Sequence, residues 1–243
     1  MQSWGITDPG CVRTQNQDTF LMEELDRNTL LCVVCDGMGG AKSGNIASTL
    51  AADVFVQQIR DGWRSNLSTT EVDDLLRNTI KLVNFTVYDQ AMQFADFEGM
   101  GTTLVAALIH GKRVAIVNVG DSRCYHLRAD GIRQITVDHS LVQMMIQRGE
   151  LTSEQGRKYP GKNLITRAIG TESSVLCDLF HLDVERGEGL LLCSDGLSNV
   201  MDDQEILFEF IHGSDRQNCC GQLLEVAKNR GAPDNVTCIL VQI

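Results

Sequence analysis

The stretch Thr29–Gly40 reads TLLCVVCDGMGG and joins a run of apolar residues to a carboxylate and a glycine-rich turn. Its first part, Thr29–Cys35, is apolar and rich in leucine and valine, which indicates a buried β-strand. Asp36 follows this strand directly, and the glycines after it allow the backbone to bend sharply. The stretch therefore predicts a core strand that carries a carboxylate to the edge of a sheet.

Three other apolar runs carry a carboxylate in the same way. LLLCS leads into Asp195 and Gly196, VAIVNVG leads into Asp121, and Asp234 with Asn235 precedes VTCILV. Each such pair alone is typical of a turn. Brought together, two carboxylates 4 Å apart repel by about 4 kcal/mol at an effective dielectric constant of 20, so a cation is expected among them. The candidate ligands are all oxygens, which favours Mg²⁺ or Mn²⁺ over zinc.

The remaining segments alternate between strand-like and helix-like patterns. Strands are predicted at Asp18–Glu23, Thr29–Cys35, Thr103–His110, Arg113–Val119, Arg123–Leu127, Ile132–Gln134, Gly189–Cys193 and Val236–Gln242. Helices are predicted at Ser43–Ile59, Ser68–Phe94, Ser140–Arg148, Asp203–Ile211 and Gln217–Arg230. Thr69 or Thr70 is the expected cap of the second helix. Two long helices early and others late, with strand pairs between them, predict an α+β sandwich.

Size and composition limit the possible classes of protein. The 243 residues, 43% of them apolar, are enough for a core without a staple, and no linker-like segment divides them, so one domain over residues 1–243 is expected. The net charge of −11 argues against a nucleic-acid partner. The start of the chain lacks the features of a secretion signal, and no apolar stretch approaches 18 residues, so a cytoplasmic protein without a membrane span is expected. The expected oligomeric state is a monomer.

The nine cysteines include one CxxC pair, Cys32 and Cys35, which could suggest redox chemistry or half of a zinc site. Both lie inside the predicted strand, where positions three apart point to opposite faces of a sheet. No second CxxC or paired histidine completes a zinc site. The thiols are therefore expected to be reduced, buried apolar groups.

Two further motifs concern phosphate. DGMGG at Asp36–Gly40 matches neither G-x-G-x-x-G nor G-x-x-x-x-G-K-[ST], which argues against a nucleotide-binding loop. Arg13 precedes the first predicted strand in the pattern R-x-x-N-Q-D, and a guanidinium group is well shaped to hold a phosphoryl group through two hydrogen bonds. The alternative for Arg13 is an ordinary surface ion pair.

Six motifs in order resemble the metal-dependent protein serine/threonine phosphatases of type 2C, the PPM family, in its bacterial branch. They are GITDPGCVRTQNQD, VVCDGMGG, GTT, VGDSR, LCSDGL and APDNVT, beginning at residues 5, 33, 101, 119, 192 and 232. The resemblance implies a four-layer αββα sandwich, in which two antiparallel sheets are flanked by antiparallel helix pairs, with a metal centre in a cleft at one edge. It also implies hydrolysis of phosphoserine and phosphothreonine by a water that bridges two Mn²⁺ or Mg²⁺ ions.

The resemblance also implies a metal-binding role for each carboxylate. Asp36 matches the residue that bridges two ions in the family, and Asp195 and Asp234 match the residues that complete the first ion's shell. The carbonyl of Gly37 matches a ligand of the second ion. Asp121, together with Asp195, matches a third, weaker site.

Other positions either match or depart from the family's catalytic residues. Arg13 falls on the phosphate-binding arginine, and Asp18 falls on the residue that hydrogen-bonds metal-bound water. Met38 stands where many eukaryotic relatives have a histidine assigned as general acid, so the proton for the leaving group must come from water or another residue. Gln17 replaces a glutamate of some relatives. His139 is a further candidate, for which a structural role or the anchoring of a flap is the alternative.

The polar segment of residues 139–171 matches the family's flap, which lies beside the cleft and could select substrates. The expected substrates are phosphorylated proteins, including the targets of a bacterial serine/threonine kinase and the kinase itself. Two rivals are a silent module that binds phosphoproteins and a phosphatase that acts on a small regulatory protein. A silent module is expected to lack a metal-ligating aspartate, and this chain retains Asp36, Asp195 and Asp234.

Overall fold

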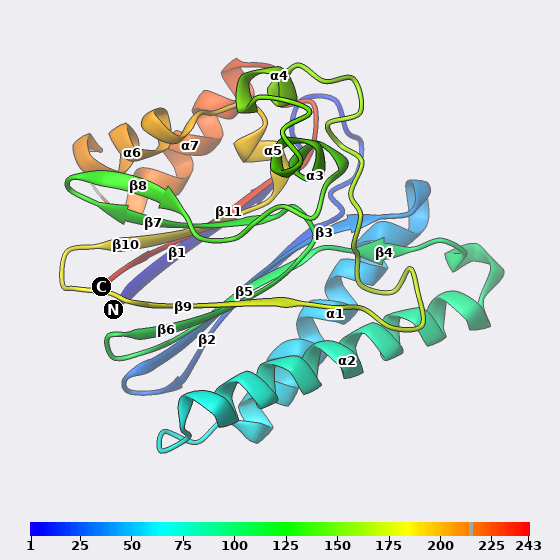
Figure 1. Ribbon diagram of the computed structural model, residues 1–243, viewed down its shortest axis with the longest axis horizontal. Coiled ribbons are helices and arrows are strands. Elements are labelled where there is room, and N and C mark those ends of the chain that lie inside the picture. The colour runs from blue at the N-terminus through cyan, green and yellow to red at the C-terminus, as the bar shows by residue number, and fades with distance from the viewer. Residues whose placement is uncertain (214–215) are drawn as a thin grey trace.

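A computed structural model describes residues 1–213 and 216–243, without the side chains of residues 40–42. Two antiparallel sheets form the middle of the molecule (Figure 1). The first sheet has the strand order β1 (Gln2–Asp8), β11 (Val236–Gln242), β10 (Gly189–Cys193), β7 (Arg123–Arg128) and β8 (Gly131–Gln134). The second has the order β2 (Asp18–Asp26), β3 (Thr29–Met38), β5 (Leu104–His110), β6 (Arg113–Val119) and β9 (Asp178–Asp183), and β4 (Gly101–Thr102) pairs with β3.

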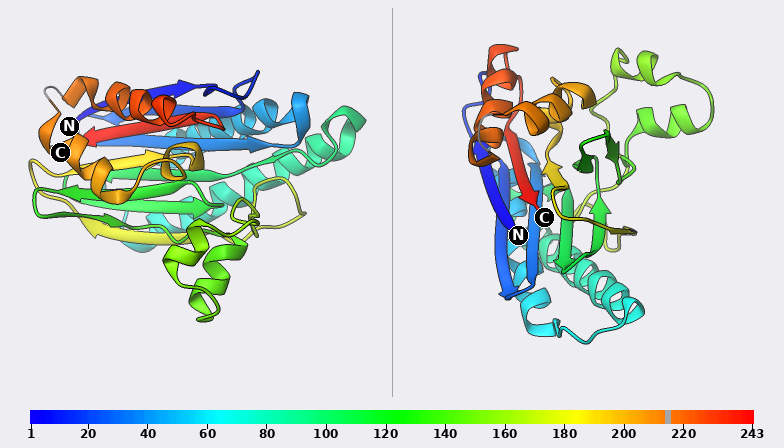
Figure 2. Two further views of the ribbon diagram at one scale, coloured as in Figure 1. Left: turned by 90° about the horizontal axis from the view of Figure 1, so that it is seen from above. Right: turned by 90° about the vertical axis from the view of Figure 1, so that its left-hand side faces the viewer.

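Helices cover the outer face of each sheet (Figures 1 and 2). The helices α1 (Gly40–Gly62) and α2 (Thr69–Gln93) lie on the second sheet, and η1 (Ala95–Phe97) follows them. The helices α5 (Asp195–Ser198), α6 (Asp203–His212) and α7 (Arg216–Asn229) lie on the first. Two short helices, α3 (Leu141–Gln147) and α4 (Ser153–Arg157), project to one side (Figure 2). The predicted four-layer α+β sandwich is therefore confirmed.

Burial of apolar side chains explains the layers, because each interface between layers has its own cluster. One cluster fills the space between the sheets, and the two others join each sheet to its helices. Cys32 belongs to the cluster between the sheets, whereas Cys35 belongs to the cluster under α1 and α2. The two thiols thus point to opposite faces of β3 as predicted, and burial raises the pKa of both.

Some local predictions were wrong. The strands β1 and β9 were not predicted. Each is an edge strand of its sheet, and β1 is half-exposed and contains Gly5. Ser68, not Thr69 or Thr70, caps α2: its hydroxyl accepts a hydrogen bond from the Glu71 N–H, and the Glu71 carboxylate accepts one from the Ser68 N–H. The structure therefore begins α2 with a capping box, in which both partners are needed.

Antiparallel pairing brings distant parts of the chain to one edge of the sandwich. The start of β2 pairs with the end of β3, and the start of β5 pairs with the end of β6. In the other sheet the end of β10 pairs with the start of β11. Because all these ends lie at the same edge, the loops that follow them can share one cleft. None of the helices among the described residues is both long enough and apolar enough to pass through a membrane.

Candidate active site

The five aspartates singled out from the sequence meet in or beside one cleft of about 470 Å³ at this edge. Asp36 lies near the end of β3, Asp121 follows β6, Asp195 begins α5, and Asp234 precedes β11; all four line the cleft. Asp18 begins β2 and pairs with Asp36 in the strand register. The fold thus assembles carboxylates that are up to 216 residues apart in the chain, from Asp18 to Asp234.

Asp36 and Asp195 both line the cleft, where their carboxylates repel each other. Burial raises the pKa of Asp36 well above its ordinary value, and the charges of Asp18, Asp195, Asp121 and Asp234 raise it further. Burial and the charge of Asp234 also raise the pKa of Asp195. These carboxylates are therefore poorly compensated by the protein itself, as expected of groups that receive a cation.

Asp18 joins the two sheets beneath the cleft. Its Oδ2 accepts a hydrogen bond of 2.8 Å from the hydroxyl of Ser194. Its Oδ1 is buried without a hydrogen-bond partner among the described residues. Burial raises the pKa of Asp18 to about 6, with the charges of Asp195 and Asp234 adding to the rise and the hydroxyls of Thr237 and Ser194 opposing it. The unsatisfied oxygen is a place for one further donor, such as a water.

Asp121 is buried, with only 8% of its surface accessible to solvent. Burial raises its pKa to about 8, and the charges of Asp195 and Asp138 add to the rise. Within the described part of the chain, no three acidic, histidine or cysteine side chains converge closely enough to form a complete ligand set by themselves. Water and main-chain carbonyls would have to complete the shell of any ion, which is usual for Mg²⁺.

Arg13 lines the same cleft from the loop between β1 and β2. Its guanidinium group donates a hydrogen bond of 2.9 Å to Oδ2 of Asp234, with 53% of the Arg13 side chain exposed. The structure therefore brings Arg13 to the carboxylates, and leaves most of its donors directed at solvent or ligand. Gln17, Gly37 and Met38 line the cleft too, so the position expected for a general acid is held by a thioether.

Two polar residues, Thr103 and Asn235, hold the cleft together. The hydroxyl of Thr103 accepts a hydrogen bond from the Asp36 N–H and also contacts the hydroxyl of Ser122. Asn235 accepts from the Gln17 N–H and donates to the carbonyl oxygens of Pro9 and Gln15. Thr103 thus fixes β3, and Asn235 fixes the loop that carries Arg13. In the sequence, Asn235 directly follows Asp234, whereas Thr103 is the last residue of the GTT motif.

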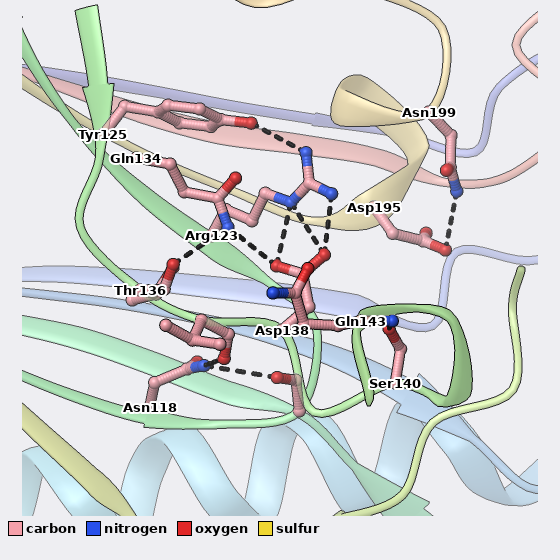
Figure 3. A network of polar contacts seen from close by, with 12 residues as sticks. Asn118, Arg123, Tyr125, Gln134, Thr136, Asp138, Ser140, Gln143, Asp195 and Asn199 are labelled. Carbon is pink, nitrogen blue, oxygen red and sulfur yellow. Dashed lines mark hydrogen bonds and ion pairs between the residues drawn. The ribbon is translucent and has the colours of Figure 1, made fainter. Parts of the chain in front are cut away.

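A second polar network lies next to the carboxylates (Figure 3). Arg123 donates two hydrogen bonds to Oδ2 of Asp138, at 2.7 and 3.1 Å, one to Oδ1 at 3.0 Å, and a further one to the hydroxyl of Tyr125. Asn199 donates to Oδ2 of Asp195 at 2.9 Å. This network fixes the walls around Asp121 and Asp195.

His139 does not line the described cleft. Its ring is 6% exposed and lies between the Gly120 N–H and the carboxylate of Asp178, so a contact with a leaving group is not available to it. Of the two interpretations of His139, the structure therefore supports the structural one. The flap of residues 139–171 contains α3 and α4, and its residues Asn163 and Ile165 line the cleft.

Two antiparallel sheets between helix layers, with an acidic cleft at their common edge and an arginine beside it, are the architecture of the metal-dependent protein phosphatases. A family model described as protein phosphatase 2C matches residues 12–222. The chain belongs to the protein phosphatase 2C family, and its enzyme class is that of the phosphoprotein phosphatases.

Relatives and solved structures agree with this assignment. The serine/threonine phosphatase stp of Listeria monocytogenes is 38% identical over 241 residues, which cover 97% of this chain and 93% of that protein. The structure of the serine/threonine phosphatase Stp1 from Staphylococcus aureus has a TM-score of 0.93 at 36% identity and covers 100% of this chain and 94% of that one. The serine/threonine phosphatase PstP/Ppp of Mycobacterium tuberculosis has a TM-score of 0.88 at 32% identity, with coverage of 100% and 98%.

Proposed function

We propose that this chain removes phosphate from phosphoserine and phosphothreonine in proteins, with two Mn²⁺ or Mg²⁺ ions and an optional third in the cleft. The observation that carries the proposal is the meeting of Asp36, Asp121, Asp195 and Asp234 in one cleft with Arg13 beside them. Their buried, mutually repelling carboxylates fit a site for hard divalent cations. When bound, such ions would stabilise charge on the phosphoryl oxygens and lower the pKa of an attacking water.

Different residues of the cleft would bind the metal ions and the phosphoryl group. Asp36, Asp195 and Asp234, with the carbonyl of Gly37, would hold the first two ions, and Asp121 would share the third with Asp195. Arg13 would bind two phosphoryl oxygens through its free N–H groups, because a guanidinium group presents its donors in a fixed fork.

Asp18 would orient the attacking water through Oδ1, the buried oxygen that lacks a partner among the described residues. The leaving serine or threonine oxygen needs a proton, and Met38 has none to give, so water is the proposed donor. The whole chain, residues 1–243, is proposed to act as one catalytic domain with the flap as its substrate-facing part. A bacterial serine/threonine kinase and its targets are the proposed substrates, while a cytoplasmic location, a monomeric state and the absence of a nucleic-acid partner stay predictions.

Metal dependence tests the proposal directly. We expect hydrolysis of p-nitrophenyl phosphate and of a phosphothreonine peptide with Mn²⁺ or Mg²⁺, and a loss of about 100-fold or more with chelator, because the ions supply both nucleophile and charge stabilisation. Asp195→Asn is expected to lose activity to a similar degree. Asp130→Asn, at an exposed hairpin position, is the control and should retain it. Equal rates with and without metal would overturn the mechanism, and metal binding without hydrolysis would favour the silent module.

Arg13→Ala separates phosphate binding from metal binding. We expect kcat/KM to fall by about 10- to 100-fold, because the variant loses charge-assisted hydrogen bonds to the phosphoryl group. Mn²⁺ affinity measured by calorimetry should stay nearly unchanged, because Arg13 supplies no ligand. Arg60→Ala is a matched control, since Arg60 also forms a half-exposed ion pair, with Glu23, at the far end of α1. A collapse of Mn²⁺ affinity in Arg13→Ala would show that the phosphate assignment is wrong.

A further inference from the structure

His139 is the first residue of the flap, and its backbone and side chain both bind the turn that carries Asp121. The Gly120 N–H donates a hydrogen bond of 3.0 Å to Nδ1 of His139, and the Gly120 carbonyl accepts one of 3.0 Å from the His139 N–H. His139 thus binds both the N–H and the carbonyl of Gly120, and the Asn118 side-chain amide donates to the same carbonyl at 3.2 Å. Because Asp121 follows Gly120 directly, this clamp restricts the direction in which the Asp121 side chain leaves the backbone.

The second ring nitrogen of His139, Nε2, contacts a residue that follows the flap in the chain. Nε2 lies 3.2 Å from Oδ2 of Asp178, the first residue of β9, and 3.1 Å from Nη1 of Arg167 in the flap. An amide N–H can only donate, so Nδ1 must be the acceptor, and the proton of the neutral ring is on Nε2, where it can be donated to Asp178. Arg167 donates to the other carboxylate oxygen of Asp178 at 2.9 Å. The Gly120 N–H therefore sets the tautomer of the neutral ring, and the Nε2 side of the ring faces both Asp178 and Arg167.

The two ends of the flap meet at the same place. Ser140 and Ile165 form an isolated antiparallel bridge, and the Thr166 N–H donates a hydrogen bond of 2.7 Å to the His139 carbonyl. Ile165 lines the cleft together with Asp121. A shift of the flap base would therefore displace His139 and, through its hydrogen bonds, Gly120.

Gly120 itself has little freedom to adjust. Its φ is 108°, a backbone conformation that residues other than glycine rarely adopt. A Cβ at this position would lie 2.5 Å from Cγ2 of Thr103. Thr103 in turn binds the Asp36 N–H, so the turn packs against the residue that holds β3. The Gly120–Asp121 turn is thus fixed by sterics on one side and by His139 on the other.

We infer that His139 is a positioning residue: Nδ1 sets the direction of Asp121, and Nε2 holds the base of the flap to β9 through Asp178. The inference rests on the proposed function. Loss of the Nδ1 contact should change catalysis, and loss of the Nε2 contacts should change substrate binding. A histidine that only stabilised the fold would not separate these two effects. Asparagine places its carbonyl oxygen near the position of Nδ1, and glutamine places its terminal group near that of Nε2. His139→Asn therefore removes the contacts of Nε2 with Asp178 and Arg167, and His139→Gln removes the contact of Nδ1 with Gly120.

The first experiment compares His139→Asn and His139→Gln with Mn²⁺, p-nitrophenyl phosphate and a phosphothreonine peptide. His139→Asn keeps the Gly120 contact, so kcat for the small substrate should stay within about threefold, while KM for the peptide rises about tenfold because the flap is released. His139→Gln frees Gly120, so kcat should fall about 10- to 100-fold for both substrates, a typical cost of losing a residue that orients a ligand. Equal effects of the two substitutions would overturn the inference.

Two controls separate positioning from stability. Asp178→Ala removes a carboxylate that is 40% exposed and should reproduce the effects of His139→Asn without disturbing the core. His126→Asn breaks a matched buried contact, in which Nε2 of His126 lies 2.8 Å from Glu188 in the other sheet. This control should lower the melting temperature without changing KM or kcat. If His126→Asn changes the kinetics as His139→Gln does, the inference fails.

A readout independent of activity distinguishes this inference from the proposed function. Amide hydrogen exchange at Gly120 in the metal-free protein should be faster in His139→Gln than in the wild type and unchanged in His139→Asn, because only the first loses the acceptor. If the wild type binds no Mn²⁺ and hydrolyses neither substrate, the proposed function fails whatever the exchange shows. Unchanged exchange in His139→Gln would overturn the inference even in an active enzyme.

Discussion

Asp36→Asn is expected to abolish phosphatase activity and, at the same time, to stabilise the metal-free protein. Activity should fall by about 10³-fold or more, because the variant loses the carboxylate proposed to bind both ions and with it the charge that holds them. Without metal, however, burial and the charges of Asp18, Asp195, Asp121 and Asp234 raise the pKa of Asp36, so ionisation of this carboxyl group costs free energy in the folded state. The amide keeps the shape of the side chain and removes the repulsion.

The size of the stabilisation follows from the charges. Two charges 4 Å apart repel by about 4 kcal/mol at an effective dielectric constant of 20, so neutralising one of five is expected to raise the free energy of unfolding by about 1–3 kcal/mol at pH 8. Denaturant unfolding in chelator measures this quantity, and calorimetry measures the loss of Mn²⁺ binding. Asp53→Asn, at an exposed position of α1, is the matched control and should change neither. A less stable but still active Asp36→Asn would contradict the proposed site.

The same charges make the stability of the metal-free protein depend on pH in an unusual direction. Folding raises the pKa of Asp18 from 3.8 to about 6 and that of Asp121 to about 8, mainly through burial. The folded state therefore binds more protons than the unfolded state between pH 4 and 8, and stability should fall as the pH rises through this range. In Asp36→Asn the slope should be shallower. Saturating Mn²⁺ should reverse the trend in the wild type, because the ion binds the deprotonated carboxylates.

The positions of the cleft carboxylates at strand ends could be predicted because the signal was local at each position. An apolar run that ends in Asp-Gly, or begins after Asp-Asn, places a carboxylate at a strand end whatever the rest of the chain does. Antiparallel pairing then fixes which ends share an edge, and the order of the motifs identified the family. The local patterns place Asp36, Asp195 and Asp234 at strand ends, and the fold brings these ends together in one cleft.

What could not be predicted depends on contacts between distant segments. The strand β9 was missed because its six residues, DLFHLD, have a charged residue at each end and gain their partner only by pairing with β6. The role of Thr103 needs both Asp36 and Ser122, and the role of His139 needs Gly120 and Asp178. None of these pairs leaves a spacing in the sequence, because such hydrogen bonds join residues from about 20 to 70 positions apart, most of them in loops.

Gly196→Ala is expected to give the largest loss of stability of any single methyl addition near the cleft. Gly196 follows Asp195 in α5, and a Cβ there would lie 1.8 Å from the carbonyl oxygen of Asn235, a backbone atom that cannot rotate away. The segments that carry Asp195 and Asp234 would have to separate. The expected loss is about 3 kcal/mol, at the upper end for overpacking. For a chain of this length, it corresponds to a fall in melting temperature of about 6–12 °C.

Gly221→Ala is the matched control, because Gly221 lies inside α7 with nothing within 4 Å of the added Cβ. It should stabilise the protein by up to about 1 kcal/mol through the higher helix propensity of alanine. The same addition of one methyl group should thus have opposite signs at the two positions. Thermal unfolding with and without Mn²⁺ checks this, and the metal should raise the melting temperature of Gly196→Ala less than that of the wild type, since the displaced carboxylates bind it more weakly. A melting temperature and a Mn²⁺ response equal to those of the wild type would mean that the Asp195 and Asp234 segments do not need this close approach to hold the ions.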